Sequence, residues 1–94
     1  MGITITDRLM HSAETRHTAE LTDGGWEASW LPGHALDRNQ AITAMTIAET
    51  VGHGLEPGDR LWPAVGAWAA ELGLTGPDAV ARAAEPETDR EAGQ

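Results

Sequence analysis

Several residue types are missing from this chain of 94 residues, and each absence excludes a class of protein. Cysteine is absent, which excludes a disulfide framework and thiol chemistry. Lysine is absent as well, and the six arginines are spread singly along the chain, so we expect no nucleic-acid binding through a basic stripe. No apolar run reaches the roughly 18 residues of a membrane helix, so we expect no membrane-spanning segment.

The charge balance and the N-terminal segment bear on partner and compartment. The net charge of −9 either keeps the protein in solution or forms an acidic surface for a basic partner. The first residues, MGITITDRLMH, lack the basic and apolar regions of a secretory signal. We therefore expect a cytoplasmic protein.

Residues 16–31 predict an antiparallel β-hairpin, because two stretches in which apolar and polar residues alternate flank the turn sequence TDGG. An Asp-Gly loop would place Glu20 opposite Glu27, whereas a Gly-Gly loop would place Glu20 opposite Ser29 and avoid the repulsion of two carboxylates. Both registers stay open. In either register the apolar face consists of Ala19, Leu21, Trp26, Ala28 and Trp30, and the polar face of Glu20, Thr22, Glu27 and Ser29.

Tryptophan supplies every aromatic side chain, because phenylalanine and tyrosine are absent. A short helix rich in alanine has room for one indole of the hairpin. We expect this to be Trp30, which lies beside the predicted turn Pro32-Gly33 that leads into the helix. We expect Trp26 to lie nearer the edge of the sheet, where it can contact a partner.

Three helices are predicted after the hairpin. The first follows Asp37, an N-cap residue with a glutamine three positions later, and ends near Gly52. The second starts near Trp62, which we expect to be partly exposed, and ends at Gly73. The third begins after Thr75. The apolar stripe of the second helix consists of Leu61, Val65, Trp68 and Leu72.

The sequence contains no pattern of catalytic or metal-binding residues. Ser12 and Ser29 lack the glycine-flanked turn of a hydrolase nucleophile, and no glycine-rich loop opens a helix to hold a phosphate. The four histidines are not spaced as metal ligands, although His34 and His53 flank the first predicted helix and could meet in space. We expect ordinary surface histidines, no enzyme activity, no cofactor and no metal.

The stretch ELTDGGWEASWLPGHALDRNQAITAMTIAET resembles a family of small uncharacterised proteins from Streptomyces-like actinobacteria. The resemblance covers about residues 15–85, and its motif is the G-W-x-x-S-W-L-P-G turn followed by the A-I-T-A-M helix start. It implies an actinobacterial source, which agrees with the lysine-free composition. It implies no particular activity.

These features predict a single α+β domain over residues 13–85, in which an N-terminal antiparallel hairpin, with a possible third strand, packs on two or three helices. Residues 1–12 are predicted to be an edge strand or poorly ordered. Residues 86–94 are predicted to be an acidic, disordered tail.

The sequence favours a non-enzymatic protein–protein interaction module, acting as a homodimer or as an accessory subunit of a bacterial regulator. Its candidate contact residues are Trp26, Trp30 and Trp62. Two alternatives stay open. One is an acidic inhibitor that mimics DNA or sequesters a regulator, and the other is a small-ligand binder with a tryptophan-lined pocket.

Overall fold

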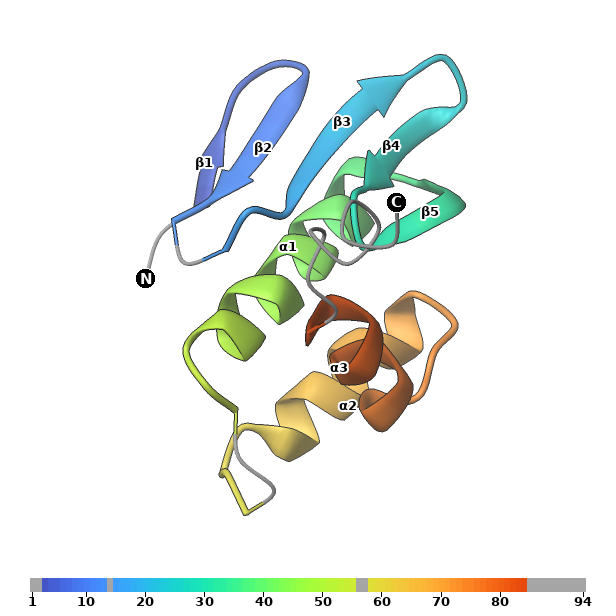
Figure 1. The fold of residues 1–94 in the computed structure, drawn as a ribbon. Coiled ribbons are helices and arrows are strands. Elements are labelled where there is room, and N and C mark those ends of the chain that lie inside the picture. Colours follow the sequence, from blue (N-terminus) through green and yellow to red (C-terminus); the bar gives the residue numbers. More distant parts are fainter. Residues whose placement is uncertain (1–2, 14, 56–57, 85–94) are drawn as a thin grey trace, which may run out of the picture.

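The chain forms a five-stranded antiparallel sheet, a long helix packed on one face of the sheet, and two shorter helices on the far side of that helix (Figure 1). This computed structural model describes residues 3–13, 15–55 and 58–84. The strands are β1 (Ile3–Ile5), β2 (Leu9–Ser12), β3 (Thr18–Thr22), β4 (Gly25–Ala28) and β5 (Leu31–Leu36). The helices are α1 (Arg38–Gly52), α2 (Trp62–Glu71) and α3 (Gly76–Ala84).

The α+β class agrees with the prediction, but the sheet is larger than expected, with the strands in chain order from β1 to β5. Residues 9–12 form β2, and a strand runs through Pro32 and Gly33 where we expected a turn. This strand, β5, accommodates the positive φ of Gly33, +84°, because its register against β4 is irregular between Trp26 and Ala28.

The β3–β4 hairpin adopts the first of the two registers that the sequence leaves open. Thr22 pairs with Gly25, so Asp23 and Gly24 form a two-residue loop. Gly25 has a φ of +125°, and a Cβ atom there would lie 2.9 Å from the carbonyl oxygen of Leu36, so only glycine fits. The conformational preference of this turn therefore determines the register, even though that register places Glu20 opposite Glu27.

The face of the sheet that packs on α1, here called the inner face, is built from small and aliphatic side chains. A row of directly paired residues crosses four strands, and none of its members has exposed area: Met10, Ala19, Ala28 and Leu31. The fully buried apolar residues of α1 are Ala41, Ala44, Met45, Ile47 and Ala48. Because alanines occur on both sides, the helix can approach the sheet closely.

The start of α1 has the predicted cap. The Asp37 carboxylate accepts a hydrogen bond from the Gln40 backbone N–H at 2.7 Å, and the Gln40 side chain accepts one from the Asp37 N–H at 2.9 Å. The helix ends at Gly52, as expected. The polar residues Glu49 and Thr50 near the end of α1 are buried, because α1 is covered by the sheet on one side and by α2 and α3 on the other.

The second helix begins at Trp62, as predicted, and has a proline in its first turn. Its predicted apolar stripe is correct for Val65 and Leu72, which are buried, whereas Trp68 is only partly buried against the core. Leu61 is 43% exposed, contrary to the prediction, because it precedes the first turn of the helix.

The third helix starts as expected after Thr75, whose hydroxyl accepts a hydrogen bond from the Asp78 backbone N–H at 3.2 Å. Ala79 and Ala83 are its buried positions toward the other helices. The predicted tail, residues 86–94, lies outside the described residues. No helix among the described residues is long and apolar enough to cross a membrane.

Candidate functional site

The face of the sheet opposite α1 is covered by no helix in the described part of the chain, and we call it the open face (Figure 1). Its members follow from the pairing of the strands, because directly opposed residues share a face. They are Thr4, Leu9, His11, Thr18, Glu20, Thr22 and Glu27. All of them except Leu9 are polar. They include Glu20, Thr22 and Glu27, which the sequence placed on the polar face of the hairpin.

Two glutamates face each other at the centre of this surface. Glu20 on β3 pairs directly with Glu27 on β4, and both residues are exposed. Like charges in directly opposed positions destabilise a sheet, and cross-strand pairs change its stability by roughly 0.2–1 kcal/mol. No arginine or histidine of the described residues forms an ion pair with either carboxylate. The fold therefore keeps an unfavourable pair of charges on its open face.

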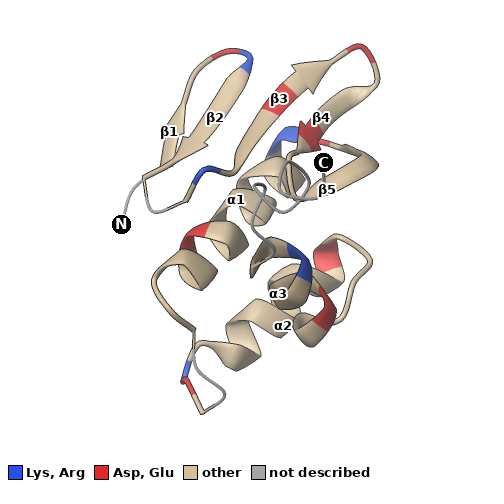
Figure 2. Cartoon of the chain, viewed as in Figure 1, with Lys and Arg blue, Asp and Glu red and all other residues tan. Residues whose placement is uncertain are grey.

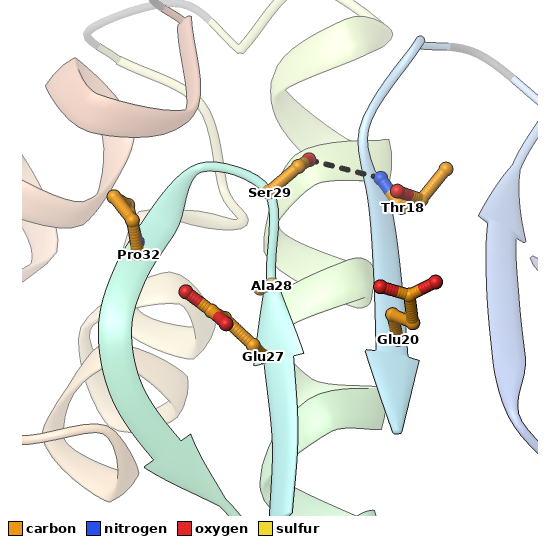
Figure 3. Close-up of a pocket in the computed structure, with 6 residues that line it drawn as sticks. All are labelled: Thr18, Glu20, Glu27, Ala28, Ser29 and Pro32. Atoms are coloured by element: carbon orange, nitrogen blue, oxygen red, sulfur yellow. Dashed lines mark hydrogen bonds between the residues drawn. The ribbon is translucent and has the colours of Figure 1, made fainter. Parts of the chain in front are cut away.

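A shallow hollow of about 200 Å³ lies around these glutamates. Figure 3 shows both side chains projecting from neighbouring strands, with the Glu27 carboxylate directed toward β5. The hollow is lined by Thr18, Glu20, Glu27, Ala28, Ser29 and Pro32. A second hollow of about 160 Å³ shares Glu27 and continues toward the end of the hairpin, lined by Thr22, Gly24, Trp26, Gly33, His34 and Ala35.

The position of Glu27 is held by β5. Its carboxylate accepts a hydrogen bond from the Gly33 backbone N–H at 3.0 Å. Glu20 forms no such bond to the described residues, so its carboxylate keeps its full capacity to accept hydrogen bonds from a cation. The positive φ of Gly33 is thus part of the geometry that orients one wall of the hollow.

A buried histidine contacts Ser29, one of the residues that line the hollow. His17, only 6% exposed, lies with Nε2 2.7 Å from the carbonyl oxygen of Ala83 and Nδ1 3.0 Å from the hydroxyl of Ser29. The carbonyl can only accept, so Nε2 carries a hydrogen and donates it to Ala83, while Nδ1 shares a hydrogen bond with the Ser29 hydroxyl. The Ser29 oxygen in turn accepts from the Thr18 N–H at 3.0 Å (Figure 3).

This histidine network positions the sheet rather than preparing Ser29 for acyl transfer. A nucleophilic serine needs nearby N–H donors for the oxyanion that develops. The Ser29 backbone N–H already donates to the carbonyl oxygen of Thr18 at 2.7 Å, and the carboxylates of Glu20 and Glu27 would repel an oxyanion. The prediction of an ordinary surface histidine is wrong for His17, because α3 covers it.

The remaining histidines do not assemble a site. His34 lies on β5 before α1 and His53 follows the last turn of α1, so the length of a 15-residue helix, about 22 Å, separates the two ends. They therefore do not meet as the sequence allowed. Within the described ranges no three histidine, aspartate or glutamate side chains gather in a group that could hold a metal ion.

The structure separates the three tryptophans that the sequence nominated as contact residues. Trp26 and Trp30 are each 5% exposed, on the inner side of the sheet, and Trp62 is partly buried at the start of α2. The burial of Trp30 is as predicted, and its Nε1 donates to the carbonyl oxygen of Ala44 at 3.1 Å.

Trp26 was expected near the edge of the sheet, and this prediction is wrong. It pairs with Leu21 on one side and with Leu36 on the other, because β5 makes β4 an interior strand. The prediction assumed a hairpin that could bury one indole on the helix, and it did not include β5. With Trp26 and Trp30 in the core, the largest open surface of the sheet is the polar one.

Comparison of the chain with protein-family models, with curated proteins and with solved structures found no match. The resemblance to an actinobacterial family stays a prediction.

Proposed function

We propose that the chain is a non-enzymatic protein–protein interaction module that binds a basic segment of its partner on the open face of the sheet. The observation that carries this proposal is the opposed pair Glu20 and Glu27, exposed beside a hollow and without an ion pair to the described residues. An arginine side chain placed between them would relieve their repulsion and donate to both carboxylates.

The distribution of charge supports a basic partner. Residues 18–36, which span β3 to β5, contain three acidic side chains and no arginine or lysine. Figure 2 shows these acidic residues on β3, on β4 and in the turn between them, whereas the described arginines lie at the β1–β2 turn, after β2, on α1 and α3, and in the loop before α2. Such an uneven field attracts a cationic segment to one region of the surface and speeds its association.

In its fuller form the proposal is an accessory subunit of a bacterial regulator in the cytoplasm. The main alternative is an acidic inhibitor that mimics DNA or sequesters a regulator. Both would use the same carboxylates, but a DNA mimic engages a surface built to neutralise many phosphates, so its complex loses affinity steeply with salt. Two central glutamates favour a short basic segment with a shallower salt dependence.

A small-ligand binder receives less support from the geometry. The two hollows, of about 200 Å³ and 160 Å³, are smaller than the roughly 300–1,000 Å³ of ordinary ligand pockets. Trp26 lines the smaller hollow, but it is 5% exposed and offers little indole surface.

The proposal can be tested with a short peptide of alternating arginine and serine, by isothermal titration calorimetry. We expect Glu20→Gln with Glu27→Gln to weaken binding about tenfold, because two exposed ion pairs together contribute up to about 2 kcal/mol. The matched control, Asp7→Asn with Glu71→Gln, makes the same change in net charge at two exposed residues away from the hollow. Equal losses in both doubly substituted proteins, or no binding by the wild type, would contradict the proposal.

A further inference from the structure

The two edges of the sheet differ in how they are protected against pairing with another strand. β5 contains Pro32 and Gly33, has an irregular register, and uses the Gly33 N–H to bind Glu27. Such features blunt an edge. The sequence of β1, Ile-Thr-Ile, contains no proline, glycine or charge. It therefore lacks every one of these protections.

The backbone of β1 directs hydrogen-bonding groups away from the sheet. The Thr6 N–H donates to the carbonyl oxygen of Leu9 at 2.8 Å across the β1–β2 turn. Because backbone groups alternate in direction along a strand, those of Thr4 also point toward β2. Those of Ile3 and Ile5 point outward, where no strand of the described residues pairs with β1.

An apolar side chain lies at this same edge. Ile5 pairs with the fully buried Met10, so its side chain is on the inner face. It is nevertheless 36% exposed, and only one other large apolar side chain of the described residues, Leu61, is comparably exposed. Ile3, its neighbour on the same face, packs against the core. The inner face thus continues past the area that α1 covers.

We propose that β1 pairs antiparallel with β1 of a second copy of this chain, in a register centred on Thr4. In that register Ile3 of one copy lies opposite Ile5 of the other, and the outward N–H and C=O groups of both residues find partners. The arrangement is self-complementary, as a two-fold interface requires. It also covers Ile5 with the isoleucine of the other copy.

The distribution of charge favours a second copy at this edge over contact elsewhere. Two chains with a net charge of −9 repel each other over most of their surfaces. Strands β1 and β2 contain no acidic residue, and the charges that flank β2 in the sequence balance, whereas Glu20 and Glu27 lie on the strands beyond it. Pairing through β1 therefore keeps the acidic strands of the two copies at opposite ends of the joined sheet.

The size of the contact predicts a weak dimer. A strand of three residues buries less than the roughly 1,200 Å² at which specific interfaces become stable. Opposed residues of an antiparallel pair share a face, so the two open faces would lie on the same side of the joined sheet. A partner with two basic segments would then bind both copies and hold the dimer together.

Thiol cross-linking tests the register directly, because the chain contains no cysteine of its own. In the proposed pairing Thr4 faces Thr4 of the other copy in a position without hydrogen bonds, where Cα atoms lie about 4.5 Å apart, within the range of a disulfide. We expect Thr4→Cys to oxidise to a dimer about tenfold faster or more than Thr22→Cys, an exposed position at the other end of the same face.

A second substitution separates edge pairing from random collision. Adding Ile5→Lys to Thr4→Cys should slow cross-linking to the rate of Thr22→Cys, because a charge blunts the edge. Adding Ala35→Lys, at an exposed position on β5, should leave the rate unchanged. Circular dichroism checks that each variant is folded. Equal rates for Thr4→Cys and Thr22→Cys, or no effect of Ile5→Lys on a folded variant, would overturn the proposal.

Discussion

The two faces of the sheet are made by the same five strands, but they differ in their chemistry and in what determines it. On the inner face, Ala19 and Ala28 pair directly without exposed area, and α1 packs on them. One residue along each strand, Glu20 and Glu27 pair on the open face, where both are exposed. The two alanines on the inner face leave room for α1, whereas the repulsion between the two glutamates on the open face lowers the stability of the fold.

The two faces also differ in whether packing accounts for the residues found on them. Small side chains and indoles on the inner face follow from the close approach of α1, because a larger residue in place of an alanine would have no space. Nothing in the packing requires two glutamates on the open face. We therefore propose that the residues of the inner face serve folding and that those of the open face serve binding. The variants below test that assignment, in order of their expected effect on stability.

The largest loss of stability is expected for Trp30→Ala on the inner side. This change removes a buried indole and its hydrogen bond to the Ala44 carbonyl, and such truncations lower the free energy of unfolding by about 3–5 kcal/mol. Urea denaturation followed by circular dichroism would measure it. A loss below about 1 kcal/mol would show that Trp30 is not part of the core.

A smaller loss is expected for His17→Ala, which breaks the connection between the sheet and α3. The buried carbonyl of Ala83 would lose its partner, which costs about 1–3 kcal/mol, whereas the part-buried Ser29 oxygen would keep its bond from the Thr18 N–H. His11→Ala on the open face is the control and should change stability by less than about 0.5 kcal/mol. Similar losses in both variants would contradict the buried network.

The N-cap of α1 predicts a loss of intermediate size that is independent of either face. Asp37→Ala removes the acceptor for the Gln40 N–H and should lower stability by about 1 kcal/mol. Asp37→Asn keeps a side-chain oxygen and should retain most of it. If Asp37→Ala leaves the melting temperature unchanged, the capping box does not stabilise the helix in solution.

The smallest effect, and the only expected gain, is for Glu20→Gln on the open face. Relief of the repulsion with Glu27 should raise the free energy of unfolding by about 0.2–1 kcal/mol, because Glu20 makes no ion pair with the described residues. The same variant should bind the arginine–serine peptide less tightly than the wild type. A loss of stability would mean that Glu20 supports the fold.

Local patterns predicted the elements whose partners are close in sequence. The cap of α1 needs only Asp37 and Gln40, and the β3–β4 hairpin needs only its turn, so both are correct in the structure. The polar face of the hairpin also follows from alternation alone. The sequence therefore indicated where the two glutamates of the candidate site point, although it left their pairing open.

Features that depend on distant partners were missed. The burial of His17 depends on Ala83, which is 66 residues away in the chain. The burial of Trp26 depends on β5, and the sequence of β5 suggested a turn because it contains Pro32 and Gly33. In both cases a tertiary contact overrides a local preference. For the same reason, the sequence suggested Trp26 and Trp30 as contact residues, although β5 and α1 bury them.

Thiol reactivity on the two faces, with and without the basic peptide, tests the central assignment most directly. Thr18 lines the hollow on the open face, and its neighbour Ala19 is fully buried on the inner face. The thiol of Thr18→Cys should react readily with a disulfide reagent and be protected when the arginine–serine peptide is added. The thiol of Ala19→Cys should react slowly with or without peptide. A Thr18→Cys thiol whose rate the bound peptide leaves unchanged, or an Ala19→Cys thiol that reacts equally fast in a folded protein, would contradict the account.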